Sequence, residues 1–342
     1  MSKISEIEVP TLFNKFPKEP RPYPISEREN LMLALSHEKP KWMPNFEGST
    51  QDLTPGGTGG NHGRDESFTN EWGVEFQYSE VQGSATNVST VLDEITNWKS
   101  LEFPTVDREQ IAKDAAGFVR DESLALCSHM INSCFELLHM LEGFEQALVD
   151  LIMEPKTCRD FFEEVMDLVI DRFKEENKHY HYDYIMYHDD WGTARGPFFS
   201  VDLMKETMLE PTKRLAKAVQ AEGVRFVFHN CGLVNDFVPY MVDEIGADAL
   251  QIQHINDLKH IISTYGAKTT VEFRRPETFK MFDPETTLDE VRGFARAAVD
   301  MYGAHVNPGA GAVVTINAPS ADVFNAFDEE MVMYSMEKYR NL

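Results

Sequence analysis

The chain is poor in cysteine and in basic residues, and both shortages limit what it can be. Its 342 residues include four cysteines, with no C-x-x-C pair and no spacing typical of disulfides, which favours a reducing, cytoplasmic setting. Lysine and arginine total 32 against 57 acidic residues, giving a net charge of −25. Such a surface repels phosphate backbones, so nucleic-acid binding is not expected.

Long apolar runs and several catalytic motifs are also missing from the sequence. The first residues form no apolar signal core, and no run approaches the length of a membrane span, so no membrane segment is expected. The sequence contains neither G-x-x-x-x-G-K-[ST] nor G-x-S-x-G, and the glycines at 56–60 follow no strand. P-loop, α/β-hydrolase and dinucleotide-fingerprint chemistries are therefore excluded.

The sequence does contain an alternation of short apolar strands with helices. Residues 1–25, with five prolines, predict an extended N-terminal arm, and Ser26 with Glu29 predicts a capping box for a helix that ends at Ser36. Residues 48–71 are polar and glycine-rich, and predict a long loop of the kind that covers a site. Strands are expected at 42–46, 74–78, 123–127, 184–188, 224–229, 248–252, 268–273 and 311–317. Further helices are expected at 135–154, 158–178, 201–222, 234–245, 256–265 and 286–302.

Eight strands that alternate with helices predict an α/β fold, a TIM (β/α)8 barrel formed by one domain over 26–342. In that fold the chemistry lies at the carboxyl ends of the strands. Polar and titratable residues do follow the expected strands, at His188, Asp189, Asp190, His229, Cys231, Gln253, His254, Glu272, Arg274 and Asn317.

The most informative strand end is His229-Asn230-Cys231-Gly232, directly after an apolar run. Imidazole nitrogen and thiolate sulfur are ligands that zinc prefers, so this segment is a candidate for half of a zinc site. Other strand-end residues also have structural interpretations. Asp189 or Asp190 could cap the following turn, His254 could be a hydrogen-bonded loop residue, and Arg274 could pair with a nearby acid.

Several segments resemble the uroporphyrinogen decarboxylase superfamily. They are Asp189-Asp190-Trp191-Gly192-Thr193-Ala194-Arg195-Gly196-Pro197 with Ser200 and Glu210-Pro211, then His229-x-Cys231-Gly232, Glu244-Ile245-Gly246-Ala247-Asp248-Ala249, and Phe135 through Gly143-Phe144-Glu145. Glu71-Trp72-Gly73-Val74 matches a pattern common in the methyltransferase branch. The resemblance runs from about residue 26 to the end, and it implies a TIM barrel, in agreement with the strand count.

The resemblance implies one of two chemistries. One branch decarboxylates a porphyrinogen without a cofactor, and holds the substrate's carboxylates with arginines near the first strand. Residues 41–47 contain no arginine, which disfavours that branch. The other branch exchanges a methyl group with a corrinoid cobalt, often with zinc held by H-x-C and a later cysteine. No cysteine follows Cys231, and Asn317 lies where the later one would fall, so an oxygen ligand is expected instead, Glu272 first and Asp190 second.

The favoured hypothesis is a methyltransferase that moves a methyl group from an O-methyl donor, favoured as a methoxylated aromatic, to the cobalt of a separate corrinoid protein. Zinc held by His229, Cys231 and Glu272 would stabilise the leaving oxygen as a Lewis acid. Asp190 or His188 would act as the general acid.

The favoured hypothesis also predicts residues that contact the substrate. These are Trp191, Arg195, Phe198, Phe199, His254, Arg274 and Asn317, although core packing is an alternative for the aromatic ones. A docking surface for the corrinoid protein is expected around 48–71. In the alternative, a cofactor-free decarboxylase, Asp189 or Asp190 would stabilise a protonated pyrrole. A third hypothesis, a corrinoid or tetrapyrrole carrier, lacks the D-x-H-x-x-G motif.

Overall fold

The computed structural model describes residue 16 and residues 23–53, 66–79, 84–274 and 280–342. Most of the expected N-terminal arm and the centre of the expected loop at 48–71 lie outside these residues. The chain forms two compact units. The first comprises Met1–Gln51, Arg120–Ala125 and Asp248–Leu342, and the second comprises Asp52–Val119 and Leu126–Ala247. The single domain expected over 26–342 remains a prediction.

The first unit contains three parallel strands, β10 (Ala249–Ile252), β11 (Thr270–Arg274) and β12 (Ala312–Thr315). All four residues of β10 and of β12 are buried, as expected of parallel strands covered on both faces. The expected strand at 42–46 is wrong, because only Asn45 forms a bridge, to Val314. The helices are α1 (Glu27–Leu35), η1 (Glu47–Ser49), α9 (Leu258–Tyr265), α10 (Leu288–Tyr302) and α11 (Ala321–Tyr339).

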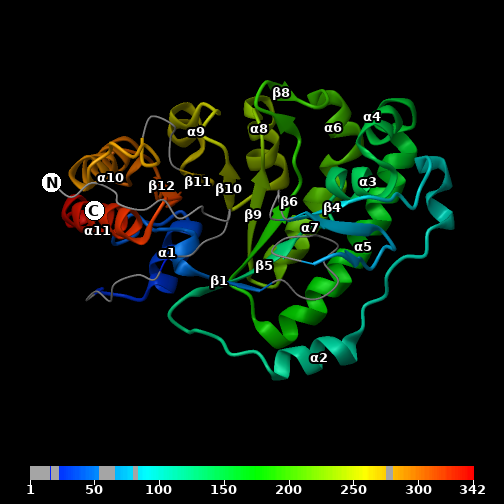
Figure 1. Ribbon diagram of the computed structural model, residues 1–342, viewed down its shortest axis with the longest axis horizontal. Coiled ribbons are helices and arrows are strands. Elements are labelled where there is room, and N and C mark those ends of the chain that lie inside the picture. The colour runs from blue at the N-terminus through cyan, green and yellow to red at the C-terminus, as the bar shows by residue number, and fades with distance from the viewer. Residues whose placement is uncertain (1–15, 17–22, 54–65, 80–83, 275–279) are drawn as a thin grey trace. The chain divides into compact units, whose positions relative to one another are not determined.

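Two helix starts in this unit follow from local capping. The Ser26–Glu29 capping box is confirmed, since Ser26 Oγ accepts the Glu29 N–H and the Glu29 carboxylate accepts the Ser26 N–H. Thr287 and Glu290 form a second box at α10. Helix α11, which the sequence analysis did not predict, begins at the cap Ser320 and packs beside α10 (Figure 1).

The second unit is built on three other parallel strands, β5 (Ala125–Met130), β6 (Tyr184–His188) and β9 (Arg225–Asn230). Strand β6 has the predicted bounds, whereas β5 runs three residues beyond its predicted end. The helices are η2 (Ile95–Ser100), α2 (Arg108–Ala116), α3 (Phe135–Glu142), α4 (Phe144–Met153), α5 (Pro155–Tyr180), α6 (Val201–Thr207), α7 (Leu209–Ala221), η3 (Asn235–Phe237), α8 (Val238–Tyr240) and the π-helical η4 (Met241–Ile245). The helix expected at 135–154 is interrupted at Gly143, whose φ of 91° is incompatible with a continuous helix.

The expected barrel strand at 74–78 is wrong as a barrel strand. It is observed as β3 (Glu75–Ser79), the centre of a separate antiparallel sheet with β2 (Phe68–Thr69) and β4 (Ser84–Asn87). Its alternation of exposed and buried residues at the start suits a sheet with one solvated face. Two of the eight expected barrel strands are therefore not parallel strands. The α/β class with parallel strands is confirmed, and closure into an eight-stranded barrel is not.

Strands β5, β6 and β9 carry two chemically different faces. In register, His188 pairs with His229 and Tyr187 pairs with Phe228, and side chains alternate along each strand. One face, here called the histidine face, carries Cys127, His129, His188, His229 and, directly after β9, Cys231. The opposite face, here called the packed face, carries Ser128, Tyr187, Asp189, Phe228 and Asn230. The packed face meets α3 and η3 through an aromatic cluster of Phe135, Trp191, Phe199, Phe228 and Phe237.

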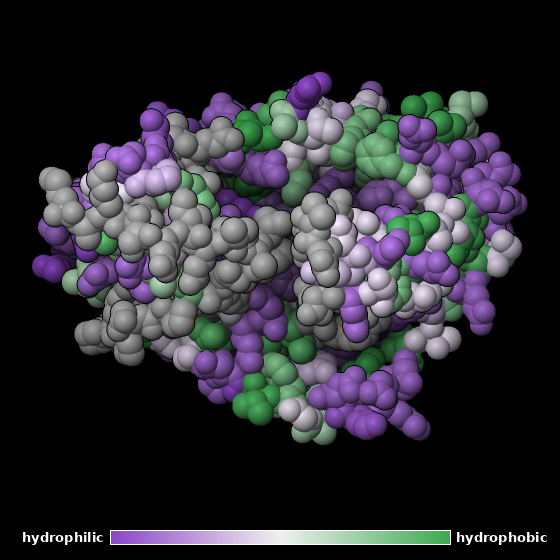
Figure 2. Space-filling view, in the orientation of Figure 1, coloured by the Kyte–Doolittle hydropathy of each residue, from purple (hydrophilic) through white to green (hydrophobic). Residues whose placement is uncertain are grey.

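The surface of the described residues is largely hydrophilic in the view of Figure 2, which agrees with the net charge. An exception lies over α4, where Phe144, Val149, Ile152 and Met153 are exposed. None of the helices in the described part of the chain combines the length and the apolar character that crossing a bilayer requires. The remaining strands are β1 (Thr50–Leu53) and the two-residue strands β7 (Gly192–Thr193) and β8 (Gly196–Pro197). Strands β7 and β8 form a hairpin.

Candidate functional site

Asp190, His229 and Cys231 form a cluster at the carboxyl ends of β6 and β9. Cys231 Sγ lies 3.4 Å from His229 Nε2, and Asp190 Oδ1 lies 3.5 Å from the same nitrogen. One potential ligand atom of each residue lies within 4.8 Å of the other two. All three side chains are partly exposed, so an ion or a substrate can reach them. The structure thus brings together the H-x-C pair and the second of the two oxygen ligands that the sequence suggested.

The separations within this cluster fit a tetrahedral zinc ion. Zn–N and Zn–O bonds of about 2.0 Å and a Zn–S bond of about 2.3 Å place the nitrogen about 3.5 Å from the sulfur and about 3.3 Å from the oxygen. The observed distances are 3.4 and 3.5 Å. The donor set of oxygen, nitrogen and sulfur is also one that zinc accepts. The residues present therefore fit a metal site with three protein ligands.

The backbone around the cluster is held by close contacts between the two motifs. Asn230 is fully buried; its Oδ1 accepts the Trp191 N–H and its Nδ2 donates to the Asp189 carbonyl. Gly232 has φ of 91°, and a Cβ there would lie 2.2 Å from the carbonyl carbon of Gly192. The glycine of H-x-C-G is thus needed because the two segments touch, and a Cβ on Gly192 would lie 3.3 Å from the Leu233 carbonyl oxygen. This contact fixes Cys231 beside Asp190, whose Oδ1 accepts the Cys231 N–H at 2.6 Å.

Asp189 caps helix α3 from a distance in sequence. Its Oδ1 accepts the backbone N–H groups of Phe135 and Glu136, and its Oδ2 accepts the Trp191 indole N–H at 2.9 Å. Ser133 Oγ donates to it as well. The side chain is fully buried, and burial raises the pKa of Asp189 to about 7 against the opposing effect of these donors. This geometry gives Asp189 a structural role, although the element that it caps is α3 and not the following turn that the sequence suggested.

Three histidines lie in a row on the histidine face. The rings of His188 and His229 are 4.6 Å apart between centroids, and His129 Nδ1 lies 2.8 Å from His188 Nε2. At the other end of the row, His129 Nε2 lies 3.2 Å from Asp52 Oδ1. Burial lowers the pKa of His129, but the nearby Cys127 sulfur and Asp52 carboxylate outweigh it and raise the pKa to about 10. The surroundings of His129 therefore favour its protonated form.

Glu272, the first oxygen ligand suggested by the sequence, belongs to the first unit. It lies on β11, fully buried, in register with Gln251 of β10 and Val313 of β12. Burial raises the pKa of Glu272 to about 7, opposed in part by Thr315 and Arg274. A role as the metal ligand of His229 and Cys231 stays a prediction.

The aromatic residues predicted to contact substrate are divided by their packing. Trp191 is fully buried and Phe199 nearly so, both within the aromatic cluster of the packed face. Phe198 is partly exposed and packs on Phe135 and Phe144. Arg195 is exposed on the hairpin of β7 and β8. Trp191 and Phe199 thus have the packing role that was the alternative, while Phe198 and Arg195 are accessible.

Three other residues predicted to contact substrate lie in the first unit. His254 follows β10, and Asn317 follows β12, both partly exposed. Arg274 ends β11, and its guanidinium lies 3.9 Å from the Glu47 carboxylate. Arg274 therefore has the acidic neighbour that its structural interpretation requires, and the contact of these residues with a substrate remains a prediction.

The Glu71-Trp72-Gly73-Val74 segment has a structural explanation. Both Glu71 oxygens pair with the Arg172 guanidinium of α5, at 2.5 and 2.7 Å. Asn132, which follows β5, donates to Glu71 and accepts the Trp72 indole N–H. A bidentate, largely buried pair of this kind fixes the β2–β4 sheet to the body of the unit.

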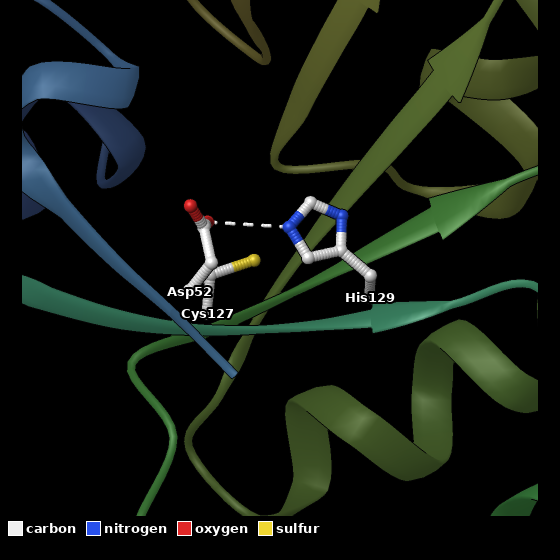
Figure 3. A group of neighbouring side chains, drawn as sticks. All are labelled: Asp52, Cys127 and His129. Carbon is white, nitrogen blue, oxygen red and sulfur yellow. Dashed lines mark hydrogen bonds and ion pairs between the residues drawn. The ribbon is translucent and has the colours of Figure 1, made fainter. Parts of the chain in front are cut away.

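Sequence reasoning missed a second group of potential ligands, Asp52, Cys127 and His129 (Figure 3). Cys127 and His129 are two residues apart on β5, so they point to the same face. The available signal was this C-x-H spacing, but the strand was predicted to end at Cys127, which placed His129 in a loop. Asp52 lies in the segment expected to be a loop, and nothing local marks it.

Comparisons with known proteins agree with this architecture. The family model described as uroporphyrinogen decarboxylase (URO-D) matches residues 69–318, well over half of the chain. A methyltransferase from Methanosarcina mazei superposes with a TM-score of 0.64 at 12% identity, covering 90% of this chain and 98% of that one. At this identity the likeness shows a shared fold.

Two more distant structures match less well. A sugar phosphate isomerase/epimerase from Parabacteroides distasonis matches at 11% identity over 75% of this chain and 82% of that one, and a xylose isomerase-like TIM barrel protein from Mycobacterium smegmatis at 14% over 64% and 76%. Both TM-scores are 0.32, and nothing about this chain follows from them. None of the curated proteins matches the sequence.

Proposed function

Because this chain belongs to the uroporphyrinogen decarboxylase family, we propose that it is a methyltransferase of the corrinoid-dependent branch. It takes a methyl group from an O-methyl donor, favoured as a methoxylated aromatic, and passes it to the cobalt of a separate corrinoid protein. The single observation that carries the proposal is the cluster of Asp190, His229 and Cys231. The fold shared with a methyltransferase is compatible with it.

The ligand set explains why an oxygen donor suits this chain. Asp190, His229 and Cys231 would hold zinc, and Glu272 remains the other oxygen ligand that the sequence predicts. The ion, when bound, supplies a Lewis acid for the leaving oxygen. A set with one sulfur leaves a harder metal than a sulfur-rich one, and alkoxide and phenolate are hard leaving groups.

The protein groups would then bind the donor and supply a proton. As the methyl carbon moves to cobalt, the C–O bonding electrons remain on oxygen, which takes up a proton to leave as an alcohol or phenol. His188 is the proposed acid. Its Nε2 lies 2.8 Å from Nδ1 of His129, a contact in which either nitrogen can be the donor, so a proton can pass between the two imidazoles. Phe198 and Arg195 are accessible residues for binding an aromatic ring with an anionic substituent.

The alternative, porphyrinogen decarboxylation, fits the described residues less well. A substrate with many carboxylates needs a cationic pocket, and Arg274, an arginine at a strand end, lies 3.9 Å from the Glu47 carboxylate. Asp189, offered as the pyrrole-stabilising group, is buried and already accepts several N–H donors. A cytoplasmic setting accompanies the proposal, because reduced cobalt and free thiols need a reducing compartment.

The test is an assay with purified protein, a reduced corrinoid protein and a panel of methoxylated aromatics, followed through the cobalt absorption spectrum. The expected result is methylated corrinoid and one demethylated phenol per turnover. Cys231→Ser should abolish the reaction, while Cys158→Ala, which removes a buried thiol of α5, should retain it. Failure with every O-methyl donor, or carbon dioxide release from a pyrrole-acetate substrate, would overturn the proposal.

A further inference from the structure

A second group of metal-binding side chains lies on the same face of the second unit as the first cluster. Asp52 Oδ1, Cys127 Sγ and His129 Nε2 come together from β1 and β5, with the imidazole pointing toward the carboxylate and the thiol pointing toward the imidazole (Figure 3). The three potential ligand atoms lie within 4.8 Å of one another. Cys127 is fully buried, whereas the Asp52 side chain is 37% exposed, so the group is anchored inside and open at one edge.

A nucleophilic cysteine is the first function to consider for Cys, His and Asp together, and the geometry argues against it. A Cys–His pair needs one imidazole nitrogen for the thiol and the other for an orienting group. Here His129 Nε2 is 3.2 Å from Asp52, and Nδ1 is 2.8 Å from His188. Both nitrogens are engaged, and the Cys127 thiol is directed to the Ser128 carbonyl at 3.5 Å. The thiol also lies beside the His129 imidazole, but Cys127 is fully buried, so a substrate cannot reach its sulfur.

The same contacts suit a metal ligand. The separation of 3.2 Å between His129 Nε2 and Asp52 Oδ1 matches the distance of about 3.3 Å expected for two ligands on a tetrahedral zinc ion. His129 would keep Nδ1–H as a donor to His188, which is the outer hydrogen bond that metal-bound histidines usually make. Oxygen, nitrogen and sulfur donors together favour zinc over magnesium or calcium.

We propose that Asp52, Cys127 and His129 form a second site for a divalent, zinc-type cation, distinct from the cluster at Asp190, His229 and Cys231. Three protein ligands leave the fourth position on the open side, beside Asp52, for water or a substrate atom. The site stands at the opposite end of the histidine row from the first cluster. Through His129 it would orient His188 and thereby the imidazole that faces His229.

The test uses Co²⁺ as the probe. Metal-depleted protein is titrated with Co²⁺, and the thiolate-to-cobalt absorption in the near ultraviolet is measured together with bound metal by mass spectrometry. Wild type should bind two equivalents. Cys127→Ser and Cys231→Ser should each bind one and lose about half of the thiolate absorption, because one sulfur ligand is removed in each. The double variant should bind none.

Two further variants separate coordination from folding. Asp52→Asn should lose the same equivalent as Cys127→Ser although both thiols remain, whereas Asp93→Asn, at an exposed position, should bind two. Far-ultraviolet circular dichroism identifies any unfolded variant. One equivalent in wild type, lost in Cys231→Ser and unchanged in Cys127→Ser, would overturn the second site and leave the proposed function intact. The converse pattern would keep the second site and remove the metal from the proposed function.

Discussion

The two faces of the β5–β6–β9 sheet are built for different purposes. On the histidine face, His188 contacts His129 on one side and His229 on the other, and a group of potential metal ligands lies at each end of this row. On the packed face, one strand position away, Asp189, Trp191 and Asn230 are fully buried and hydrogen-bonded to each other and to α3. The buried hydrogen bonds of the packed face fix the positions of the strand ends, and the histidine face carries the potential metal ligands at those ends.

The family motifs place a structural residue and a potential metal ligand at neighbouring positions. In Asp189-Asp190, the first carboxylate caps a helix and the second faces His229. In Asn230-Cys231-Gly232, Asn230 ties the two strands together, Cys231 offers a thiol, and Gly232 permits close approach. Substitutions on the histidine face should therefore change metal binding and activity, and substitutions on the packed face should change stability.

The largest expected effect is on the histidine face. Cys231→Ser should lower the methyl-transfer rate by about 1,000-fold or more, because a zinc ligand is lost, while the midpoint of urea unfolding of the metal-free protein stays within experimental error. The rate is measured from the cobalt spectrum. Cys158→Ala is the matched thiol control and should keep the rate. Full activity of the Cys231→Ser variant would contradict the assignment of the catalytic role to the histidine face.

Gly232→Ala should be strongly destabilising. The new Cβ would meet the Gly192 backbone at 2.2 Å, at a φ of 91°, and we expect a loss of about 4 kcal/mol. Gly223→Ala is the control, since it also has positive φ (79°) but no atom within 4 Å, and it should cost about 1 kcal/mol. Urea unfolding measures both. Equal losses would show that the contact with Gly192 does not matter.

Asp189→Ala should lower stability by about 3 kcal/mol, because it leaves the buried N–H groups of Trp191, Phe135 and Glu136 without their acceptor. Asp189→Asn keeps one oxygen that accepts the N–H groups of α3, but its amide N–H₂ would face the indole N–H of Trp191. The expected loss of stability is about half that of Asp189→Ala. In the folded Asn variant the transfer rate should fall less than about tenfold. A loss of several orders of magnitude with unchanged stability would restore Asp189 as a catalytic group.

The smallest effect concerns Glu142, at the end of the helix that Asp189 caps. Burial, with Asp150 nearby, raises the pKa of Glu142 from 4.5 to about 8. Below the unfolded pKa both states are protonated. Between about pH 5 and about pH 8 only the folded state keeps the proton, so stability falls as pH rises. The full shift would correspond to about 5 kcal/mol, and screening by solvent reduces the expected loss to about 2 kcal/mol.

Glu142→Gln should remove this part of the pH dependence and gain stability relative to wild type as pH rises. Glu145→Gln, at an exposed position on α4, should give a curve parallel to that of wild type. Unfolding free energies measured at several pH values decide between the two. A Glu142→Gln curve that also runs parallel to that of wild type would show that this carboxyl titrates normally.

The sequence predicted strand bounds best where a polar residue directly follows an apolar run. The bounds of β6 could be read from a short apolar run followed by His188-Asp189-Asp190. The proximity of Asp190 to His229 was predicted only as the second choice, after Glu272. The end of β5 could not be read from the sequence, because Ser128 and His129 have the polarity of a loop, although both lie within the strand. Alternation within β5 depends on pairing with β6, which no local pattern reveals.

Long-range contacts account for the other differences. Asp52 reaches His129 from a segment whose composition predicts only a loop. The residues at 42–46 are apolar enough for a strand, yet only Asn45 finds a partner, in Val314. Asp189 could be read as catalytic or as a cap, and the choice depends on the N-terminus of α3, which lies more than fifty residues earlier in the chain.

The central claim is that Asp190, His229 and Cys231 together hold a metal ion at the carboxyl ends of β6 and β9. Zinc X-ray absorption spectroscopy of the Cys127→Ser variant isolates this site from the second one. We expect a single sulfur ligand at about 2.3 Å from zinc, with nitrogen and oxygen ligands at about 2.0 Å. The sulfur ligand should be lost when Cys231 is also replaced. Bound zinc without sulfur, or a sulfur signal that survives the replacement of Cys231, would contradict it.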